Sequence, residues 1–435
     1  MSTTNNQFSP SRAGVQRSNL PAAAVLWSAL LALMLAGTPA QATLDEQPAK
    51  EKDRSIVAVF RLEGPLAEVP AAEIPPVFGP PGTSLKELVA HLGKAADDST
   101  VKAVVILPES ALLGPAQVEE LRAAMSLVRS RGKEVCVHAE SLSMAQYVLA
   151  CGASRISVVP SGAVLIPGLH GSSLHVRGLL DKIGVKPDFL TEGAYKSAAE
   201  LFMREQPSAQ ADEMMNWLMD SWYASFKDLI AQGRKADAGK VQGWLDNGLF
   251  TAEQAKTSGL IDAVEHHQDF ETMLKERYGK DLVFDKNYGR KNQPALDFSS
   301  PLALFNVLGD FLRVPQRKAA ARPAVGIVYV NGPIMTGKGR PNPFGTSLVA
   351  FSTEVREALE KAAADDSIKA VVLRVDSPGG SATASEIILD ATKRLKARKP
   401  FVVSMGDVAG SGGYYVACAA DTVFADATTL TGSIG

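Results

Sequence analysis

Apolar residues along this chain recur in short runs that alternate with amphipathic segments. In the first half, the runs at 55–60, 103–107, 134–139 and 155–159 predict strands, and the segments 84–96 and 117–131 predict helices. The second half repeats the series with strands at 324–330, 370–375, 400–404 and 422–425 and helices at 352–364 and 385–397. Strands that alternate with helices imply parallel β-sheets with covered faces, so the predicted fold class is α/β.

The two halves are copies of one unit. Residues 94–106 and 361–373 share a long run of identical or similar residues, and from Val101 and Ile368 onward the offset is constant at 267 residues (368 minus 101). The same offset aligns Cys151 with Cys418 in an apolar helix, where core packing explains both better than redox chemistry. An internal match of this length indicates a duplication. We expect repeats at 55–281 and 324–435, joined by a basic linker at 282–323 that contains a short apolar piece, 302–312. The first repeat should continue with helices at about 197–232 and 252–280.

A serine among glycines is the main chemical candidate. Ser411 lies between an apolar strand at 401–404 and a helix-like run at 414–420, with Gly410, Gly412 and Gly413 around it. A serine at a strand-to-helix turn is presented where free N–H groups favour negative charge, as a nucleophile and an oxyanion require. A glycine-rich turn with a solvated serine is the alternative.

The copies differ where this chemistry would lie. The counterpart of Ser411 is Met144, and the counterpart of Gly412 is Ala145. The second copy has Asp-Ser-Pro-Gly-Gly at 376–380, whereas the first has Glu-Ser-Ala-Leu-Leu at 109–113. An ordinary turn would need no special residues in one copy and their loss in the other, so the comparison favours a nucleophile at Ser411.

The serine needs a base, and the second half contains no histidine after His267. His170, His175, His266 and His267 would have to reach across from the first half. A lysine whose pKa is lowered by burial is the other known solution. Lys196, in Gly-Ala-Tyr-Lys-Ser-Ala-Ala at 193–199, is the candidate, and we expect it to open an apolar helix through Met203. An ordinary lysine at a helix start is the alternative for this residue alone.

The N-terminal segment predicts export. Arg12 and Arg17 precede an apolar run at 20–37 and a small-x-small end at Ala40 and Ala42, so residues 1–42 are a signal peptide or an uncleaved membrane anchor. A polar linker follows at 43–54. Either reading places the rest of the chain beyond the membrane.

Composition narrows the remaining classes. With a net charge of −2 and 46% hydrophobic residues over 435 residues, the chain is an ordinary globular protein without a nucleic-acid surface. Its three cysteines form no C-x-x-C, so we expect neither a disulfide framework nor a metal site, and no cofactor.

Together these features resemble the long bacterial type of signal peptide peptidase A, which is peptidase family S49 in the ClpP/crotonase superfamily. The motifs that carry the resemblance lie at 376–380, 409–414, 429–435 and 193–198. The resemblance implies two tandem ClpP/crotonase-like repeats, a degenerate first half that donates the lysine, and a serine endopeptidase with a Ser/Lys dyad. By this resemblance Ser411 is the nucleophile, Lys196 the general base and Ser433 the residue that orients the lysine. The backbone N–H groups of Gly379 or Gly380 and of Gly412 would form the oxyanion hole.

The family further implies signal-peptide remnants as substrates, a homotetramer, and a location at the bacterial inner membrane facing the periplasm. Without its anchor the protein would be secreted to the periplasm. The chain departs from the family pattern because it stops at Gly435, within the second repeat. That repeat is therefore expected to be incomplete, either as a piece of a longer protein or as a truncated one with exposed apolar surface. A non-catalytic scaffold and an acyl-CoA enzyme of the related crotonase fold are the competing functions, and export argues against the latter.

Overall fold

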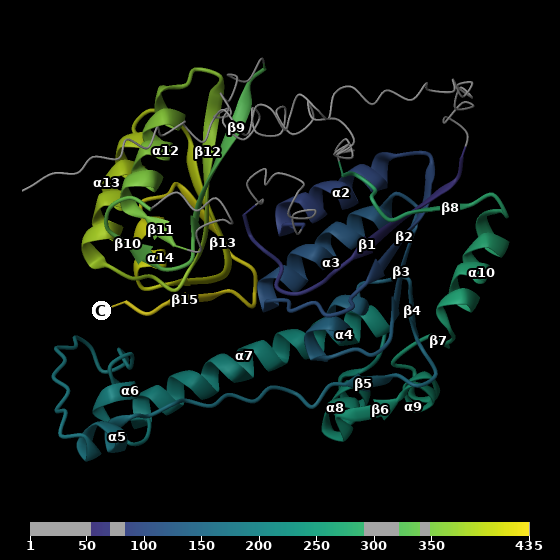
Figure 1. Cartoon of the computed structure of the whole chain (residues 1–435), viewed down its shortest axis with the longest axis horizontal. Coiled ribbons are helices and arrows are strands. Elements are labelled where there is room, and N and C mark those ends of the chain that lie inside the picture. The colour runs from purple at the N-terminus through teal and green to yellow at the C-terminus, as the bar shows by residue number, and fades with distance from the viewer. Residues whose placement is uncertain (1–53, 70–82, 291–321, 340–348, 435) are drawn as a thin grey trace, which may run out of the picture. The chain divides into compact units, whose positions relative to one another are not determined.

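The computed structural model describes residues 54–69, 83–290, 322–339 and 349–434 (Figure 1). The predicted signal peptide or anchor at 1–42, nearly all of the linker at 43–54 and the apolar piece at 302–312 lie outside these residues. None of the helices in the described ranges is long and apolar enough to cross a membrane.

The first half is built on a fully parallel six-stranded sheet in the order β7-β4-β3-β2-β1-β8. Its strands are β1 (Ile56–Arg61), β2 (Val101–Leu107), β3 (Glu134–Ala139), β4 (Arg155–Val158), β7 (Ala263–Val264) and β8 (Val283–Asp285). One face packs on α2 (Leu85–Asp97), α3 (Pro115–Ser130) and α4 (Met144–Ala150), and the other on α10 (His267–Tyr278). Side chains alternate along a strand, so Ala58 and Phe60 of β1 join one core and Val57 and Val59 the other.

The second half contains the same framework with fewer elements. Its parallel sheet has the order β14-β13-β12-β9, and β15 pairs with the far end of β13. The strands are β9 (Ala324–Asn331), β12 (Ile368–Ser377), β13 (Phe401–Gly410), β14 (Thr422–Phe424) and β15 (Leu430–Gly432). The helices α12 (Ser352–Ala364), α13 (Ala382–Lys396) and α14 (Gly412–Ala417) share one core with the sheet, and β10 (Ile334–Met335) pairs with β11 (Ala350–Phe351). The predicted α/β class with parallel, helix-covered sheets is confirmed.

Between α4 and α10 the first half carries further elements. A short antiparallel pair joins β5 (Ala163–Leu165) to β6 (Leu249–Thr251). The helices are α5 (Arg177–Lys182), α6 (Glu200–Met203), the long α7 (Ala209–Arg234), α8 (Ala238–Asn247) and α9 (Ala252–Ser258) (Figure 1).

Several predicted boundaries were wrong for local physical reasons. The expected helix at 197–232 is two helices, because Pro207 precedes Ser208, whose side chain caps α7 by accepting from Ala211 N. The expected helix at 252–280 is interrupted at Gly259, which takes a left-handed conformation at the end of α9. The first repeat also extends past residue 281, since β8 pairs with β1 inside the predicted linker.

The expectation that Cys151 and Cys418 are equivalent core residues was wrong for one of them. Cys151 is buried, but Cys418 is exposed at the end of α14. The cause is α7, which packs so closely on α4 that a side chain at Gly233 would collide with the Cys151 carbonyl at 2.0 Å. Among the described residues of the second half, no helix covers Cys418 as α7 covers Cys151.

Candidate active site

Ser411 lies between strand β13 and helix α14, at the strand-to-helix turn that the sequence predicted. Strand β13 runs on to Gly410, farther than the predicted end at 404, because its last residues pair with β15. Ser411 then caps α14 with φ 51° and ψ −113°, a region that residues with a side chain rarely adopt. The turn is held by Ser411 N donating to Gly432 O at 2.7 Å and by Tyr415 N donating to Ser411 O at 2.9 Å. Strain of this kind persists only where the surroundings enforce it, and it is concentrated at functional sites.

Lys196 comes from the first half and reaches this serine. Its Nζ lies 3.4 Å from Ser411 Oγ, 3.1 Å from Ser433 Oγ and 2.6 Å from the Ser433 carbonyl oxygen. The backbone at Lys196 is not helical, contrary to the prediction, because α6 begins only at Glu200. Ser433 follows β15 with φ 56°, which turns its hydroxyl and its carbonyl toward the same amine. The structure therefore brings the three predicted side chains Ser411, Lys196 and Ser433 together.

The predicted oxyanion donors lie beside the serine turn. Gly379 and Gly380 have φ values of 93° and 153°, and a Cβ at Gly379 would stand 2.5 Å from Gly412 N. Only glycine allows this approach. The Gly379 N–H donates to Ser377 Oγ at 3.1 Å. Gly380 forms a β-bridge with Ile334, but its own N–H takes no part in that bridge. Ile334 N donates to Gly379 O, and Ser381 N donates to Ile334 O. As the first residue of α14, Gly412 has no acceptor within its helix. Gly380 and Gly412 are thus the better placed donors.

The first-half counterpart of this site holds no nucleophile. Met144 occupies the serine position as the first residue of α4 and packs partly against the core. Of the histidines considered as a base, His175 contacts Ser173 and backbone carbonyls, and His267 pairs with Glu271. Within the described residues the side-chain hydrogen bond at Ser411 Oγ comes from Lys196 and not from a histidine.

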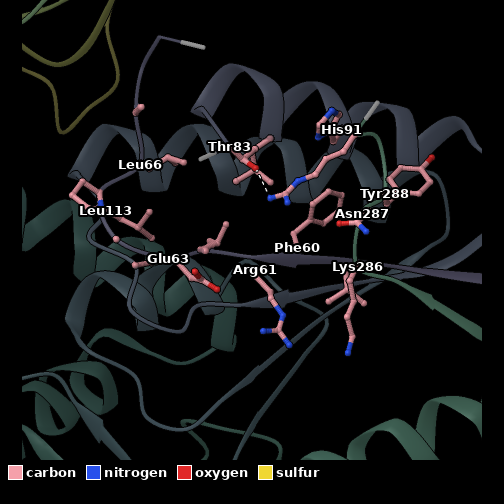
Figure 2. A pocket seen from close by; sticks show the side chains of 18 residues that line it. Phe60, Arg61, Glu63, Leu66, Thr83, His91, Leu113, Lys286, Asn287 and Tyr288 are labelled. Carbon is pink, nitrogen blue, oxygen red and sulfur yellow. Dashed lines mark hydrogen bonds between the residues drawn. The ribbon is translucent and has the colours of Figure 1, made fainter. Parts of the chain in front are cut away.

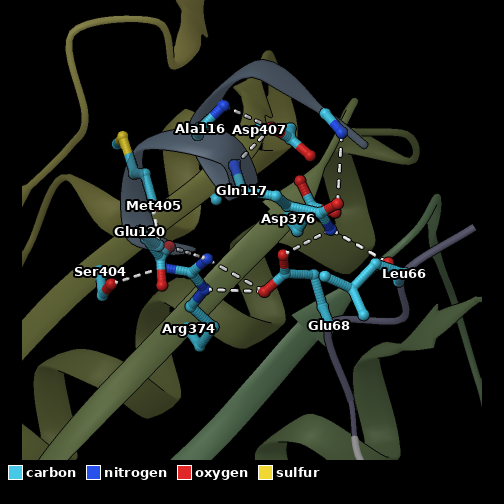
Figure 3. Close-up of polar contacts among 12 residues, drawn as sticks. Leu66, Glu68, Ala116, Gln117, Glu120, Arg374, Asp376, Ser404, Met405 and Asp407 are labelled. Carbon is cyan, nitrogen blue, oxygen red and sulfur yellow. Dashed lines mark hydrogen bonds and ion pairs between the residues drawn. The ribbon is translucent and has the colours of Figure 1, made fainter. Parts of the chain in front are cut away.

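A buried ion cluster joins the two halves near the site (Figure 3). Arg374 of β12 donates through Nε to Glu68 Oε2 at 3.0 Å and also pairs with Glu120 of α3. Glu68 is only 5% exposed, and its carboxylate also accepts from Gln117 Nε2 at 3.0 Å. Burial raises the pKa of Glu120, and Arg374 opposes that rise. Sequence reasoning missed this cluster, although Arg374 interrupts an apolar strand at the position where the first copy has Leu107.

A second set of contacts ties α3 and α7 to the segment before β15. The backbone N–H and the hydroxyl of Thr428 both donate to Glu119 Oε1, at 2.9 and 2.6 Å. Trp222 Nε1 of α7 donates to the Thr428 carbonyl at 2.9 Å. Because Ser433 lies just beyond β15, these contacts position the end of the chain that faces Lys196.

A cavity of about 420 Å³ lies elsewhere in the first half, between the end of β1 and α2 (Figure 2). Phe60, Arg61, His91 and Tyr288 are among its lining residues. Arg290, which also lines it, donates to Thr83 Oγ1. None of the predicted site residues lines it. Across the described ranges, no group of three or more His, Cys, Asp or Glu side chains is arranged to hold a metal ion.

Comparison with known proteins finds one family of peptidases. The sequence profile of peptidase family S49 matches residues 128–281 and 393–435, which include Lys196 and Ser411. The chain is 32% identical over 407 residues to protease 4 of Haemophilus influenzae, which covers 90% of this chain and 61% of that protein. It is 30% identical over 355 residues to a chloroplastic serine protease, SPPA, of Arabidopsis thaliana, covering 81% of this chain and 50% of that protein. Protease 4 of Salmonella typhi is 31% identical over 363 residues, covering 81% of this chain and 55% of its own length.

The chain therefore spans about half to three fifths of the length of these relatives. The matches run through both repeats, because they cover four fifths or more of the chain. The profile match, these relatives and the motifs around Ser411 and Lys196 all point to the same family, so the chain is similar to peptidase family S49 over most of its length.

Proposed function

We propose that this protein is a serine endopeptidase that works through a dyad of Ser411 and Lys196. The observation that carries the proposal is the contact between the halves, in which Lys196 Nζ lies 3.4 Å from Ser411 Oγ and 3.1 Å from Ser433 Oγ. Nucleophile, base and orienting group thus stand within or near hydrogen-bond reach of one another, as the chemistry of an activated serine requires. Such contacts are often longer in a free enzyme than in its substrate complex.

In the proposed reaction, Ser411 Oγ attacks the carbonyl carbon of the scissile peptide bond while its proton passes to Lys196 Nζ. The N–H groups of Gly380 and Gly412 stabilise the negative charge that develops on the carbonyl oxygen. Lys196 then gives the proton to the leaving amine, and an acyl-enzyme remains on Ser411. Water, deprotonated by Lys196, attacks the acyl carbon, the bond from that carbon to Ser411 Oγ breaks, and the carboxylic acid product leaves. Lys196 returns the proton to Ser411 Oγ, which restores the free serine. One oxyanion donor contributes roughly 3–4 kcal/mol to transition-state stabilisation.

The proposed substrates are apolar peptides such as signal-peptide remnants, at the bacterial inner membrane on the periplasmic side. Support comes from the resemblance of the motifs and from the export-type pattern at 1–42, whether it is kept as an anchor or cleaved. We also propose a homo-oligomer, a tetramer by resemblance. Support comes from the large apolar side chains Leu174, Leu190 and Trp217, which are 72%, 101% and 76% exposed and which contact with another copy would bury.

The test is hydrolysis of a fluorogenic apolar peptide by the wild-type chain and by single variants. Ser411→Ala and Lys196→Ala should each reduce kcat to background, because they remove the nucleophile and the base. Met144→Ala, the matched change at the counterpart of Ser411, should leave kcat within about twofold. A fluorophosphonate should label the wild-type chain and Met144→Ala but not Ser411→Ala.

Near-native turnover by Lys196→Ala would show that the dyad assignment is wrong. If the wild-type chain neither turned over peptide nor accepted the fluorophosphonate, the non-catalytic scaffold would replace the enzyme. Light scattering of the purified chain decides the oligomer proposal, which a monomer at micromolar concentration would refute.

A further inference from the structure

Helix α3 of the first half begins without a side-chain cap of its own. Its N-cap residue is Gly114, followed by Pro115, and its first turn contains no acidic residue. The counterpart of Gly114 in the second copy is Ser381, which caps α13 in the usual way by accepting from Ala384 N at 3.2 Å. The two copies therefore solve the same local problem differently, and the first copy leaves the amides at the start of α3 for another group.

Asp407, from the second half, supplies that group (Figure 3). Its Oδ1 accepts from Ala116 N at 2.8 Å and from Gln117 N at 3.3 Å. A side chain at Gly114 would place its Cβ 1.8 Å from Asp407 Oδ2. Since Gly114 has an ordinary φ of −74°, its backbone does not require glycine, but the closeness of Asp407 does.

The position of this contact links it to the proposed dyad. Asp407 lies on β13, the strand that ends immediately before Ser411. The first two turns of α3 also carry Glu119, which holds Thr428, and Glu120, which pairs with Arg374. The start of α3 is thus where the half that carries Lys196 meets the strand that carries Ser411.

We propose that Asp407 is a positioning residue, which caps α3 across the two halves and thereby sets the distance between Lys196 and Ser411. The inference rests on the proposed peptidase function for its kinetic consequence but not for the contact itself. The first-copy counterpart of Asp407 is Glu140, which is exposed just after β3. The second half thus caps a helix of the first half, whereas α13 of the second half is capped by its own Ser381.

The charges that face Asp407 make the contact sensitive to pH. Two carboxyl groups act on Asp407, namely Asp376 of β12, which accepts from Val408 N at 2.9 Å, and Glu68 from the segment after β1. The nearby cation, Arg374, is paired with Glu68 and Glu120. Burial, then Asp376 and Glu68, raise the pKa of Asp407 to about 6, against the lowering effect of the two α3 amides. Below that pH the carboxyl becomes neutral and loses its favourable interaction with the helix N-terminus.

The kinetic test compares Asp407→Ala and Asp407→Asn with a matched control, Asp421→Ala. Asp421 accepts from Phe401 N at 3.1 Å and pairs with Lys396, both within the second half. Asp407→Ala should lower kcat about 10- to 100-fold with little change in KM, because small misplacements of catalytic groups are costly. Asp407→Asn keeps an acceptor oxygen and should recover most of that loss. Asp421→Ala should lower the melting temperature yet leave kcat within about twofold of wild type.

The pH profile separates positioning from a merely structural role. The ratio of wild-type kcat to Asp407→Asn kcat should be roughly 2 to 5 at pH 8, where the wild-type carboxylate is charged, because charged hydrogen bonds are about twice as strong as neutral ones. It should approach one as the pH falls below about 6, since a neutral aspartic acid resembles asparagine. A ratio that stays constant from pH 5 to 8 would overturn the pH dependence and the positioning role with it.

Two further measurements keep the inference testable apart from turnover. Amide hydrogen exchange at Ala116 and Gln117 should quicken in Asp407→Ala but not in Asp421→Ala, because only the former removes the acceptor. Gly114→Ala should reproduce the loss of kcat by steric displacement without any change in charge. Wild-type exchange and wild-type kcat in Asp407→Ala, or an equal loss of kcat in Asp421→Ala, would refute the proposal. If the wild-type chain hydrolyses no peptide, the proposed function fails, and the exchange data alone decide whether Asp407 caps α3.

Discussion

The two halves of this chain share one α/β framework and differ in what they keep at equivalent positions. The second half has a strained serine between glycines, whereas the first has Met144 in a regular, partly buried helix start. Beyond Gly168, the counterpart of Gly435, the first half carries the arm from which Lys196 reaches across and the helix α10 on the second face of its sheet. The comparison teaches that, in the proposed dyad, the serine comes from one copy and the lysine that contacts it from the other.

The division requires the halves to be fixed against each other, and the equivalent positions show how. Where the first copy has apolar Leu107, the second has Arg374, and where the second copy caps its own helix with Ser381, the first depends on Asp407. A residue at such a position can be replaced by its counterpart from the other copy, and each replacement has an expected effect on stability.

Arg374→Leu, which installs the first-copy residue, should have the largest effect on stability. It leaves the buried carboxylate of Glu68 without its cation, and breaking a buried pair in this way costs about 3–5 kcal/mol. The free energy of unfolding in urea measures the loss. Changing Glu68 and Glu120 to leucine in the same chain should restore most of it, since apolar replacement of a buried ion cluster is often neutral or stabilising. A single variant as stable as wild type would mean that the hydrogen bond from Gln117 Nε2 is enough to hold the Glu68 carboxylate.

His138→Met, which installs the counterpart residue Met405, should remove an acid sensitivity of the first half. His138 is 5% exposed, accepts or donates at Ser157 Oγ at 2.9 Å, and stacks on Phe270. Burial, with help from His267, lowers the pKa of His138 to about 4. A lowered histidine pKa means that the folded state favours the neutral ring. Its contribution is therefore complete above the unfolded pKa of about 6.5 and is lost as the pH falls toward 4, on the order of 2–3 kcal/mol.

The measurement for His138 is thermal unfolding between pH 8 and pH 4. The wild-type melting temperature should fall more steeply below pH 6.5 than that of His138→Met. Parallel curves for the two proteins would show that acid acts elsewhere in the chain.

Substituting Cys151 or Cys418 should change stability the least, but the two positions should differ clearly in reactivity toward a thiol reagent. Burial raises the pKa of Cys151 to about 11 and that of Cys136 to about 12, whereas Cys418 is exposed. A maleimide should therefore modify Cys418 alone in the native chain. Cys151→Ser should cost about 1–3 kcal/mol by placing a hydroxyl in the core, whereas Cys418→Ser should stay within about 0.5 kcal/mol of wild type. Mass spectrometry after labelling and urea unfolding test both statements, and equal labelling of Cys151 would contradict the close packing of α7 on α4.

Much of the framework followed from local patterns. The strand at Glu134–Ala139 and the helix at Ser352–Ala364 have the bounds that apolar periodicity predicts, because each depends on its own residues and on one buried face. The segment at Lys196 did not follow, since its apolar residues favour a helix but its backbone forms turns from which the Lys196 side chain reaches Ser411 and Ser433. Local propensity is a weak guide where contacts with a distant segment decide the conformation.

By itself, the sequence determined the duplication, the two parallel sheets and the singular position of Ser411 between glycines. These features are local or are visible by comparing one copy with the other. The tertiary structure placed Lys196 Nζ beside Ser411 Oγ, a pairing that the sequence could only propose, and it alone revealed that Asp407 caps a helix of the other half and that the Gly379 N–H is taken by Ser377. The contact of Asp407 joins segments that carry no shared periodicity, so it depends on how one half docks on the other.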